Sequence, residues 1–167
     1  NWSPTRVQAA NEYAVQSDKH PLIAISNNIS LAAAKKPHWS GCFLTDQAAW
    51  DWHNENQFPL IPWSSQARGF FSGNFSPDKP DNLHVVDIYY TDDNFERLNR
   101  AQQLGQEKGC TAIQVSLAYV MNQPFPTFPI FGPANLDELN SSLGAVEVGL
   151  TEKEMQWLNL ASKTLGS

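Results

Sequence analysis

Residues 59–73, PLIPWSSQARGFFSG, change character half-way along. The first residues, ending at Trp63, are apolar, and their pattern predicts a short buried strand that ends in a large aromatic ring. Small and polar residues and one cation, Arg68, follow directly, before Phe70 and Phe71. Ligands sit at the carboxyl ends of strands in parallel α/β folds. Two roles are therefore open to Trp63: packing in the core, or offering a flat face to a flat heterocycle.

Two more short apolar runs, residues 22–26 and 127–131, also predict strands. Helical spacing of apolar residues, together with N-capping residues, predicts helices around them. The predicted caps are Ser3, Thr45–Asp46, Thr91, Thr111, Asn135 and Thr151. Residues 64–90 form a long connection without a clear pattern, which is typical of a functional lid or insertion.

Strands that alternate with helices predict parallel pairing through right-handed crossovers, in a single domain spanning residues 1–167. Two architectures fit: an open doubly wound sheet, or part of a (β/α)8 barrel. The sequence has neither the GxGxxG fingerprint of a dinucleotide-binding open sheet nor a Walker phosphate loop. The pattern of elements alone leaves both architectures open.

Composition excludes several classes of function. The net charge of −6 argues against a nucleic-acid partner, because phosphate contacts require clustered Lys and Arg. No apolar run approaches the roughly 18 residues of a membrane helix, so we expect no membrane partner. The only cysteines, Cys42 and Cys110, lack metal-ligand spacing, so we expect reduced thiols, no metal site and a cytoplasmic location.

Polar groups follow each predicted strand. Asn27 and Asn28 offer side-chain amides, and Arg68 offers a fixed charge suited to a phosphate or carboxylate. The third strand runs through Gly132 into a capped helix start at Asn135, which is a favourable position for an anion. Each feature also has a plain structural interpretation as a turn or loop. Together they suit an extended dinucleotide.

At these positions the sequence resembles the carboxyl-terminal half of an aldo-keto reductase, near the branch that includes the potassium-channel beta subunits and bacterial sugar-aldehyde reductases. The similarity covers nearly the whole chain. Its motifs are NWSP (1–4), NNIS (27–30), PWSSQARGFFSG (62–73), TAIQVSLAYVMNQP (111–124) and PIFGPANLDELNSSLGA (129–145). The resemblance implies a partial (β/α)8 TIM barrel, from the end of the fifth strand through the eighth strand and the C-terminal helices.

The resemblance also implies a site for NADPH or NADH. Asn1 and Asn28 would hold the nicotinamide carboxamide, and Trp63 would stack on the nicotinamide ring. The residues implied for the pyrophosphate are Ser64, Gln66, Ala67 and Arg68. Those implied for the adenosine half are Gly132, Ala134, Glu138, Ser141 and Ser142. In the family, hydride passes from the cofactor to an aldehyde or ketone carbonyl while a Tyr donates the proton.

The sequence departs from the family pattern at three places. Ser65 and Gln66 replace the usual Pro-Leu, which keeps the loop polar. Ala134 and Glu138 stand where relatives often carry Arg, Ser or Gln. The loss of positive charge near the adenosine ribose favours NADH over NADPH. Residues 141–142, a Ser pair, replace an acidic-Asn pair that usually holds the adenine.

The family's catalytic Asp, Tyr, Lys and His lie on its first four strands, whereas this sequence begins at the end of the fifth. We therefore expect no catalytic residue in the chain, which would be a fragment of a longer protein and inactive alone. Its open sheet would need an amino-terminal half-barrel or another chain as partner. The alternatives are a non-catalytic nucleotide-binding or regulatory half-barrel module, and a structural remnant that assembles with another chain.

Overall fold

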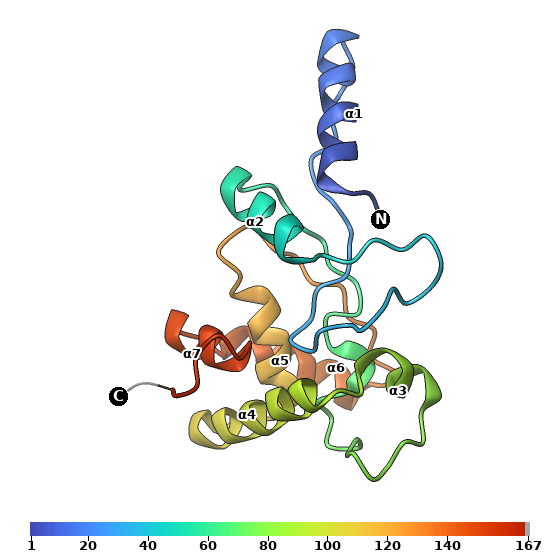
Figure 1. The fold of residues 1–167 in the computed structure, drawn as a ribbon. Coiled ribbons are helices and arrows are strands. Elements are labelled where there is room, and N and C mark those ends of the chain that lie inside the picture. The colour runs from blue at the N-terminus through green and yellow to red at the C-terminus, as the bar shows by residue number, and fades with distance from the viewer. Residues whose placement is uncertain (166–167) are drawn as a thin grey trace.

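The computed structural model describes residues 1–165; residues 166 and 167 of the predicted domain lie outside the described residues. Figure 1 shows helices joined by long loops, with α1 standing apart at the top of the view. The helices are α1 (Pro4–Gln16), α2 (Gln47–Asn56), α3 (Leu83–Tyr89), α4 (Asp92–Lys108), α5 (Ala112–Met121), α6 (Leu136–Leu143) and α7 (Glu152–Leu158). Two short 3₁₀ turns are η1 (Ala67–Gly69) and η2 (Gly144–Glu147).

Capping residues set the starts of six helices as predicted: α1, α2, α4, α5, α6 and α7. The Ser3 side chain accepts a hydrogen bond from the Arg6 N–H at the start of α1. Asp46, Thr91 and Asn135 do the same for α2, α4 and α6. Reciprocal capping boxes open α5 and α7. Each cap satisfies backbone N–H groups that have no partner inside the helix, so the local sequence suffices to place these helix starts.

The capping box predicted at the start of α6 forms only in part. Asn135 Oδ1 accepts the Glu138 N–H at 2.9 Å, as predicted. The Glu138 carboxylate accepts the Ala134 N–H at 2.8 Å and the Asn135 side-chain amide at 3.3 Å. The return bond therefore goes to the residue before the cap, and the carboxylate lies over the first turn of the helix.

The three predicted strand segments pair in parallel, as predicted, but over a much shorter length. Isolated parallel bridges join Ile25 to Leu60 and Leu60 to Thr127, which makes the Leu60 segment the central one. The Leu60 N–H donates to the Pro126 carbonyl at 2.9 Å, and its carbonyl accepts the Phe128 N–H at 2.9 Å. Prolines in these segments lack the N–H that a continuous ladder requires, which accounts for single bridges in place of extended strands.

The long connection at residues 64–90 contains a helix that the sequence pattern did not predict, α3. The Asn82 side chain caps it by accepting the Val85 N–H at 3.2 Å. Val85, Ile88 and Tyr89 are buried, at helical spacing. A capping Asn followed by apolar residues at this spacing was therefore a usable signal, and the predicted unpatterned connection was wrong in its second half.

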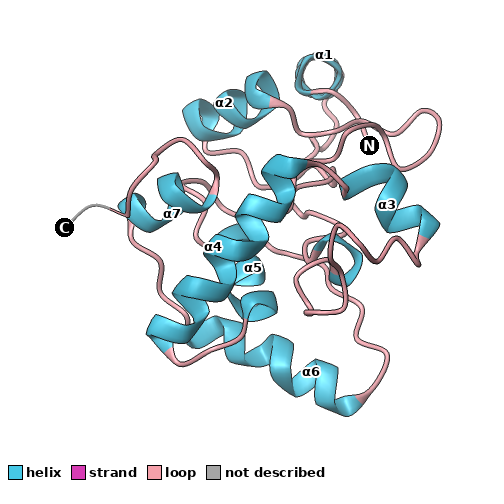
Figure 2. Ribbon diagram, turned by 60° about the horizontal axis from the view of Figure 1, so that its bottom comes forward, coloured by secondary structure: helices cyan, strands magenta, loops and turns pink. Residues whose placement is uncertain are grey.

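Two apolar clusters form the core. The larger one joins η1 and α3 to the packed helices α4, α5 and α7, of which α4 and α5 lie in the middle of Figure 2 and α7 lies to their left. The smaller one consists of Val7, Ile25, Leu60 and Phe125, and so ties α1 to the parallel segments. The parallel segments therefore sit beside a mainly helical layer, with their carboxyl ends close to the loops that carry the predicted site residues.

None of the described helices combines the length and hydrophobicity that crossing a bilayer requires. Within residues 1–165, no three His, Cys, Asp or Glu side chains gather as potential metal ligands.

Candidate functional site

The loop after Trp63 and the first turn of α6 enclose a cavity of about 920 Å³. Predicted site residues that line it are Ser64, Gln66, Arg68, Gly132, Glu138, Ser141 and Ser142. The structure therefore brings together the residues predicted for the pyrophosphate and most of those predicted for the adenosine half. Ala67 lies fully buried in the same loop, and Ala134, which does not line the cavity, donates its N–H to the lining residue Glu138.

Hydrogen bonds fix the loop in place. The buried Ser65 hydroxyl lies 3.0 Å from the Pro62 carbonyl and 3.1 Å from the Ile130 carbonyl, and so links the loop to two of the parallel segments. The Gln66 side-chain amide donates to Ser142 Oγ at 3.1 Å, which links the loop to α6. The polar residues that replace the family's Pro-Leu thus connect the two walls of the cavity.

The backbone of the loop is unusual. Ser64, Ala67 and Arg68 have positive φ angles of 53°, 48° and 54°, and Gly69 follows at 80°. Left-handed conformations cost a residue with a side chain about 1 kcal/mol or more, so the surrounding bonds must hold them. Such clusters of strained residues are typical of ligand-binding loops.

Charge is unevenly distributed around the cavity. Arg68 is exposed and forms no ion pair with any carboxylate in the described part of the chain. Asp137 and Glu138, in the first turn of α6, supply negative charge at the opposite wall. A guanidinium without an ion pair can bind a phosphate oxygen. The two carboxylates would repel any further phosphate group placed near them.

The residues predicted for the nicotinamide lie outside this cavity. The Trp63 ring stacks on Trp39, with centroids 5.0 Å apart and planes at 26°, and meets the edge of His38 at 4.9 Å. Asn28 Nδ2 donates to the Trp63 carbonyl at 3.0 Å. Asn1 Oδ1 accepts a bond from Cys42 Sγ at 3.5 Å. The role of Trp63 against a cofactor ring therefore stays a prediction, because its partner in this structure is another tryptophan.

Sequence reasoning missed the contribution of Trp39 and His38. The signal available was the run PHWSG, residues 37–41, which places two aromatic rings between a proline and a glycine in a loop. That pattern shows that the rings belong to a turn. It does not show that they fold back onto Trp63, because this contact is between segments far apart in the sequence.

A tyrosine and a histidine form a buried pair beside Trp63. Tyr89 Oη and His38 Nε2 are 2.9 Å apart. Burial raises the pKa of Tyr89 to about 12. Burial, and then the charges of Arg68 and His84, lower the pKa of His38 to about 4. Both groups are neutral near pH 7, and no tyrosine hydroxyl in residues 1–165 bonds to a lysine side chain.

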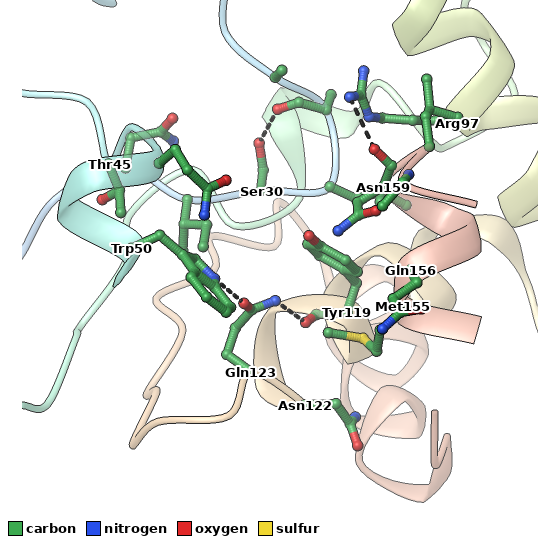
Figure 3. A pocket seen from close by; sticks show the side chains of 18 of the residues that line it. Ser30, Thr45, Trp50, Arg97, Tyr119, Asn122, Gln123, Met155, Gln156 and Asn159 are labelled. Carbon is green, nitrogen blue, oxygen red and sulfur yellow. Dashed lines mark hydrogen bonds between the residues drawn. The ribbon is translucent and has the colours of Figure 1, made fainter. Parts of the chain in front are cut away.

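A second cavity of about 920 Å³ lies between α2, α5 and α7 (Figure 3). Its polar side chains hold one another. Trp50 Nε1 donates to Gln123 Oε1 at 2.7 Å, and Arg97 donates to the Asn159 carbonyl at 3.3 Å. Asn28, which was implied for the nicotinamide together with Trp63, lines this second cavity and not the first. No sequence motif predicted this cavity.

Three curated proteins are similar to the chain in sequence. Versiconal hemiacetal acetate reductase from Aspergillus parasiticus is 23% identical over 158 residues, which cover 90% of this chain and 43% of that protein. Probable aldo-keto reductase 1 from Glycine max is 28% identical over 58% of this chain and 30% of its own length. Uncharacterized oxidoreductase YrpG from Bacillus subtilis (strain 168) is 26% identical over 60% of this chain and 31% of its own length. The chain spans less than half the length of each relative.

A solved structure is similar in fold. It is the crystal structure of a thermostable aldo-keto reductase in complex with the inhibitor epalrestat, with a TM-score of 0.56 and 18% identity over 93% of this chain and 44% of that one. This likeness supports the α/β-barrel class for the fold. The sequence profile of the Aldo/keto reductase family matches residues 1–162. The chain belongs to the aldo/keto reductase family.

Proposed function

We propose that the chain is the cofactor-binding half of an NAD(P)H-dependent aldo-keto reductase that reduces an aldehyde or ketone carbonyl. The observation that carries the proposal is the cavity between residues 64–69 and α6, where the side chains implied for the pyrophosphate and adenosine converge. Its volume of about 920 Å³ suits a bound nucleotide, since ligand pockets commonly measure roughly 300–1,000 Å³. Membership of the aldo/keto reductase family is the reason for proposing a nicotinamide cofactor.

Each wall of the cavity would have its own task. Arg68, exposed and without an ion pair among the described residues, would bind the pyrophosphate. Ser64 and Gln66 would add hydrogen-bond donors from the same loop. Gly132 leaves open space above its backbone, where an adenosine could approach closely. When bound, the nicotinamide would supply the hydride.

We further propose a preference for NADH. The Glu138 carboxylate already accepts the Ala134 N–H at 2.8 Å, so a negative charge occupies the N-terminal end of α6. NADPH differs from NADH by a phosphate on the adenosine ribose. That phosphate would lie near Glu138 and be repelled, whereas a ribose hydroxyl could donate to the carboxylate.

The proton donor would come from outside these residues. A phenol that donates a proton near pH 7 needs a lowered pKa, and burial raises the pKa of Tyr89 instead. Tyr89 is also fully buried, so a substrate carbonyl has no access to it. We therefore propose that the chain supplies the cofactor side of a barrel. This side extends from the end of the fifth strand to the eighth strand.

The same observation favours a second candidate, a nucleotide-binding or regulatory half-barrel without turnover. The two candidates differ in the proton donor alone. Purified residues 1–167 should show no reduction of a generic aldehyde with NADH or NADPH. Turnover that persists after contaminating host reductase has been removed would contradict the absence of a catalytic group in this chain.

A half-barrel needs a partner, and the outer segments carry apolar side chains suited to one. Ile23 in the first segment is 80% exposed, and Phe128 and Ile130 in the third are 60% and 51% exposed. Exposed apolar residues on unpaired segments are typical of a surface that another element covers. We propose the amino-terminal half of the family's barrel as that element, with another chain as the alternative.

Calorimetric titration of the purified chain with NADH and NADPH tests the proposed function. We expect saturable binding of NADH, weaker binding of NADPH, and a smaller difference between the two for Glu138→Gln. Glu147→Gln removes an exposed carboxylate elsewhere on the surface and is the matched control. Binding of neither nucleotide would contradict the proposal. Equal binding of both by the unmodified chain would contradict the NADH preference alone.

A further inference from the structure

We propose that residues 37–42 form a closed lid over the nicotinamide end of the site, in which Trp39 occupies the face of Trp63 that a nicotinamide ring would take. The inference rests on the proposed function, because it assigns a gate to the cofactor site proposed above. Binding of the whole cofactor then requires the lid to open, whereas binding of its adenosine and pyrophosphate part does not.

The stacking geometry is the first support. Trp39 and Trp63 lie 5.0 Å apart, centroid to centroid, with planes at 26°, which is the geometry of two stacked flat rings. Trp39 is 51% exposed and Trp63 is only half-buried, so Trp39 lies on the solvent side of the pair. Trp39 therefore covers the face through which Trp63 would otherwise be reached from outside.

The same loop also contacts a second residue that is predicted to bind the nicotinamide. Cys42, at the far end of the lid, lies with Sγ 3.5 Å from Asn1 Oδ1 and donates a bond to it. Asn1 was implied as a partner of the cofactor carboxamide. The lid thus covers the stacking surface of the predicted nicotinamide site and donates a hydrogen bond to one of its amide oxygens.

Anchors on both sides define the moving segment. Before the lid, the Lys35 N–H donates to the Ile88 carbonyl at 2.8 Å, and Lys36 pairs with Asp87 at 2.6 Å. After it, the Thr45 N–H donates to the Asn28 carbonyl at 3.3 Å. Within the lid, Gly41 has a φ of +77° and open space around it, so the turn can change its backbone angles without a clash.

The closed state also carries a cost. Trp63 Nε1 and His38 Nδ1 are both buried without a hydrogen-bond partner. A buried donor without a partner costs free energy, and opening the lid would return these groups to water. The closed lid gains the Trp39 stack and the His38–Tyr89 bond, but it retains this cost, which leaves it able to open when a ligand competes for Trp63.

The test compares NADH with ADP-ribose, which has the pyrophosphate and adenosine but no nicotinamide. Both are titrated calorimetrically into the unmodified chain and into Trp39→Ala. We expect Trp39→Ala to raise the affinity for NADH about threefold to tenfold, the factor equivalent to one aromatic pair. The affinity for ADP-ribose should change by less than about twofold, because its cavity is already open. Tyr13→Ala, an exposed aromatic on α1, is the matched control and should alter neither.

Two further variants make the test specific to the lid. Cys42→Ala frees Asn1 and should raise NADH affinity by a smaller factor, again without an effect on ADP-ribose. In a double-mutant cycle, the gain from Trp39→Ala should disappear when Trp63 is also replaced by alanine, because the two rings act as a pair. The cycle also remains informative if one single variant alters stability, since its coupling term cancels effects common to both backgrounds.

The outcomes separate the lid from the proposed function. If Trp39→Ala leaves NADH affinity unchanged or lowers it while ADP-ribose still binds, the lid is overturned and the nucleotide site stands. If neither NADH nor ADP-ribose binds to any variant, the proposed function fails and the lid fails with it. Equal gains for NADH and ADP-ribose would also overturn the lid, because they would place the obstruction at the shared part of the cofactor.

Discussion

The two ends of the predicted cofactor site differ in this structure. At the pyrophosphate and adenosine end, residues 64–69 and α6 enclose an open cavity, and Arg68 lies free at its edge. At the nicotinamide end, Trp63 is covered by Trp39, and Asn1 is bonded to Cys42. One end is therefore an open cavity, whereas the aromatic ring at the other end is covered by the chain itself.

The difference shows that the residues of a binding surface decide whether it stays open or is covered by the chain. The walls of the open end are joined by hydrogen bonds such as Gln66 to Ser142, so the end persists as a hollow. The closed end is built on an aromatic ring, and an exposed ring gains free energy by stacking on another. In this chain the aromatic face is covered by the chain's own side chain, whereas the cavity whose walls are joined by hydrogen bonds stays open.

The largest effect is expected from a substitution in the central parallel segment, which supports both ends of the site. Leu60 is fully buried in the central parallel segment, so Leu60→Ala should lower the free energy of unfolding by about 2–5 kcal/mol. Leu83→Ala, at a position 79% exposed on α3, should change it by less than about 0.5 kcal/mol. Urea unfolding followed by circular dichroism measures both. Equal midpoints for the two variants would mean that the parallel segments contribute little to the fold.

The next effect isolates the closed end. In the Trp39→Ala background, where the lid ring is gone, Trp63→Ala should weaken NADH binding by about 1–3 kcal/mol, the scale of base–aromatic stacking. ADP-ribose binding should stay the same, because it does not reach the ring. Calorimetry gives the affinities, and a denaturant melt gives the stability of each variant. A large loss of stability with unchanged NADH affinity would make Trp63 a core residue.

A smaller effect isolates the open end. Arg68→Ala should weaken NADH and ADP-ribose alike, by about 0.5–1 kcal/mol, because an exposed charge pair is strongly screened by water. The loss should shrink as salt is added. Lys153→Ala, an exposed cation on α7, is the control. An Arg68 effect confined to NADH, or one independent of salt, would place Arg68 somewhere other than at the phosphates.

The smallest effect concerns pH and the closed end. The pKa of His38 falls from 6.5 to about 4 on folding, mainly through burial, so the fold favours its neutral form. The contribution of this pKa difference to the free energy of unfolding is present above about pH 6.5. It is lost as the pH falls toward 4, because the unfolded state then binds the proton first. Between about pH 7 and pH 6, where only the first part of this loss appears, His38→Gln should lose less stability than the parent. The exposed His20→Gln should match the parent, and identical pH profiles for all three would show that His38 does not contribute.

Local signals made most of the helices predictable. The caps at Ser3, Thr91 and Thr111 each act within a few residues, so the sequence alone located α1, α4 and α5. The parallel segments were predicted in the right order but at too great a length. Pro59, Pro62 and the prolines that flank the third segment remove ladder donors, and this effect was not weighed against the apolar pattern.

The candidate site was predictable at one end only. The residues implied for the pyrophosphate and adenosine lie on two short segments whose ends meet, and the cavity includes most of them. The nicotinamide end depends on Trp39 folding back onto Trp63 and on Cys42 reaching Asn1, across long stretches of chain. Contacts of that kind follow from the packing of the whole molecule, and a motif read along the sequence carries no information about them.

Mapping of NADH binding by two-dimensional NMR, with the backbone amides assigned, tests whether NADH binds at the open cavity and displaces the lid. We expect saturable shifts in residues 64–69 and 132–142, followed by changes in residues 37–42 as the lid opens. ADP-ribose should shift the first two segments and leave 37–42 unchanged. Shifts centred on the second cavity, around Arg97 and Tyr119, would rule out the proposed site, as would the absence of shifts with either ligand.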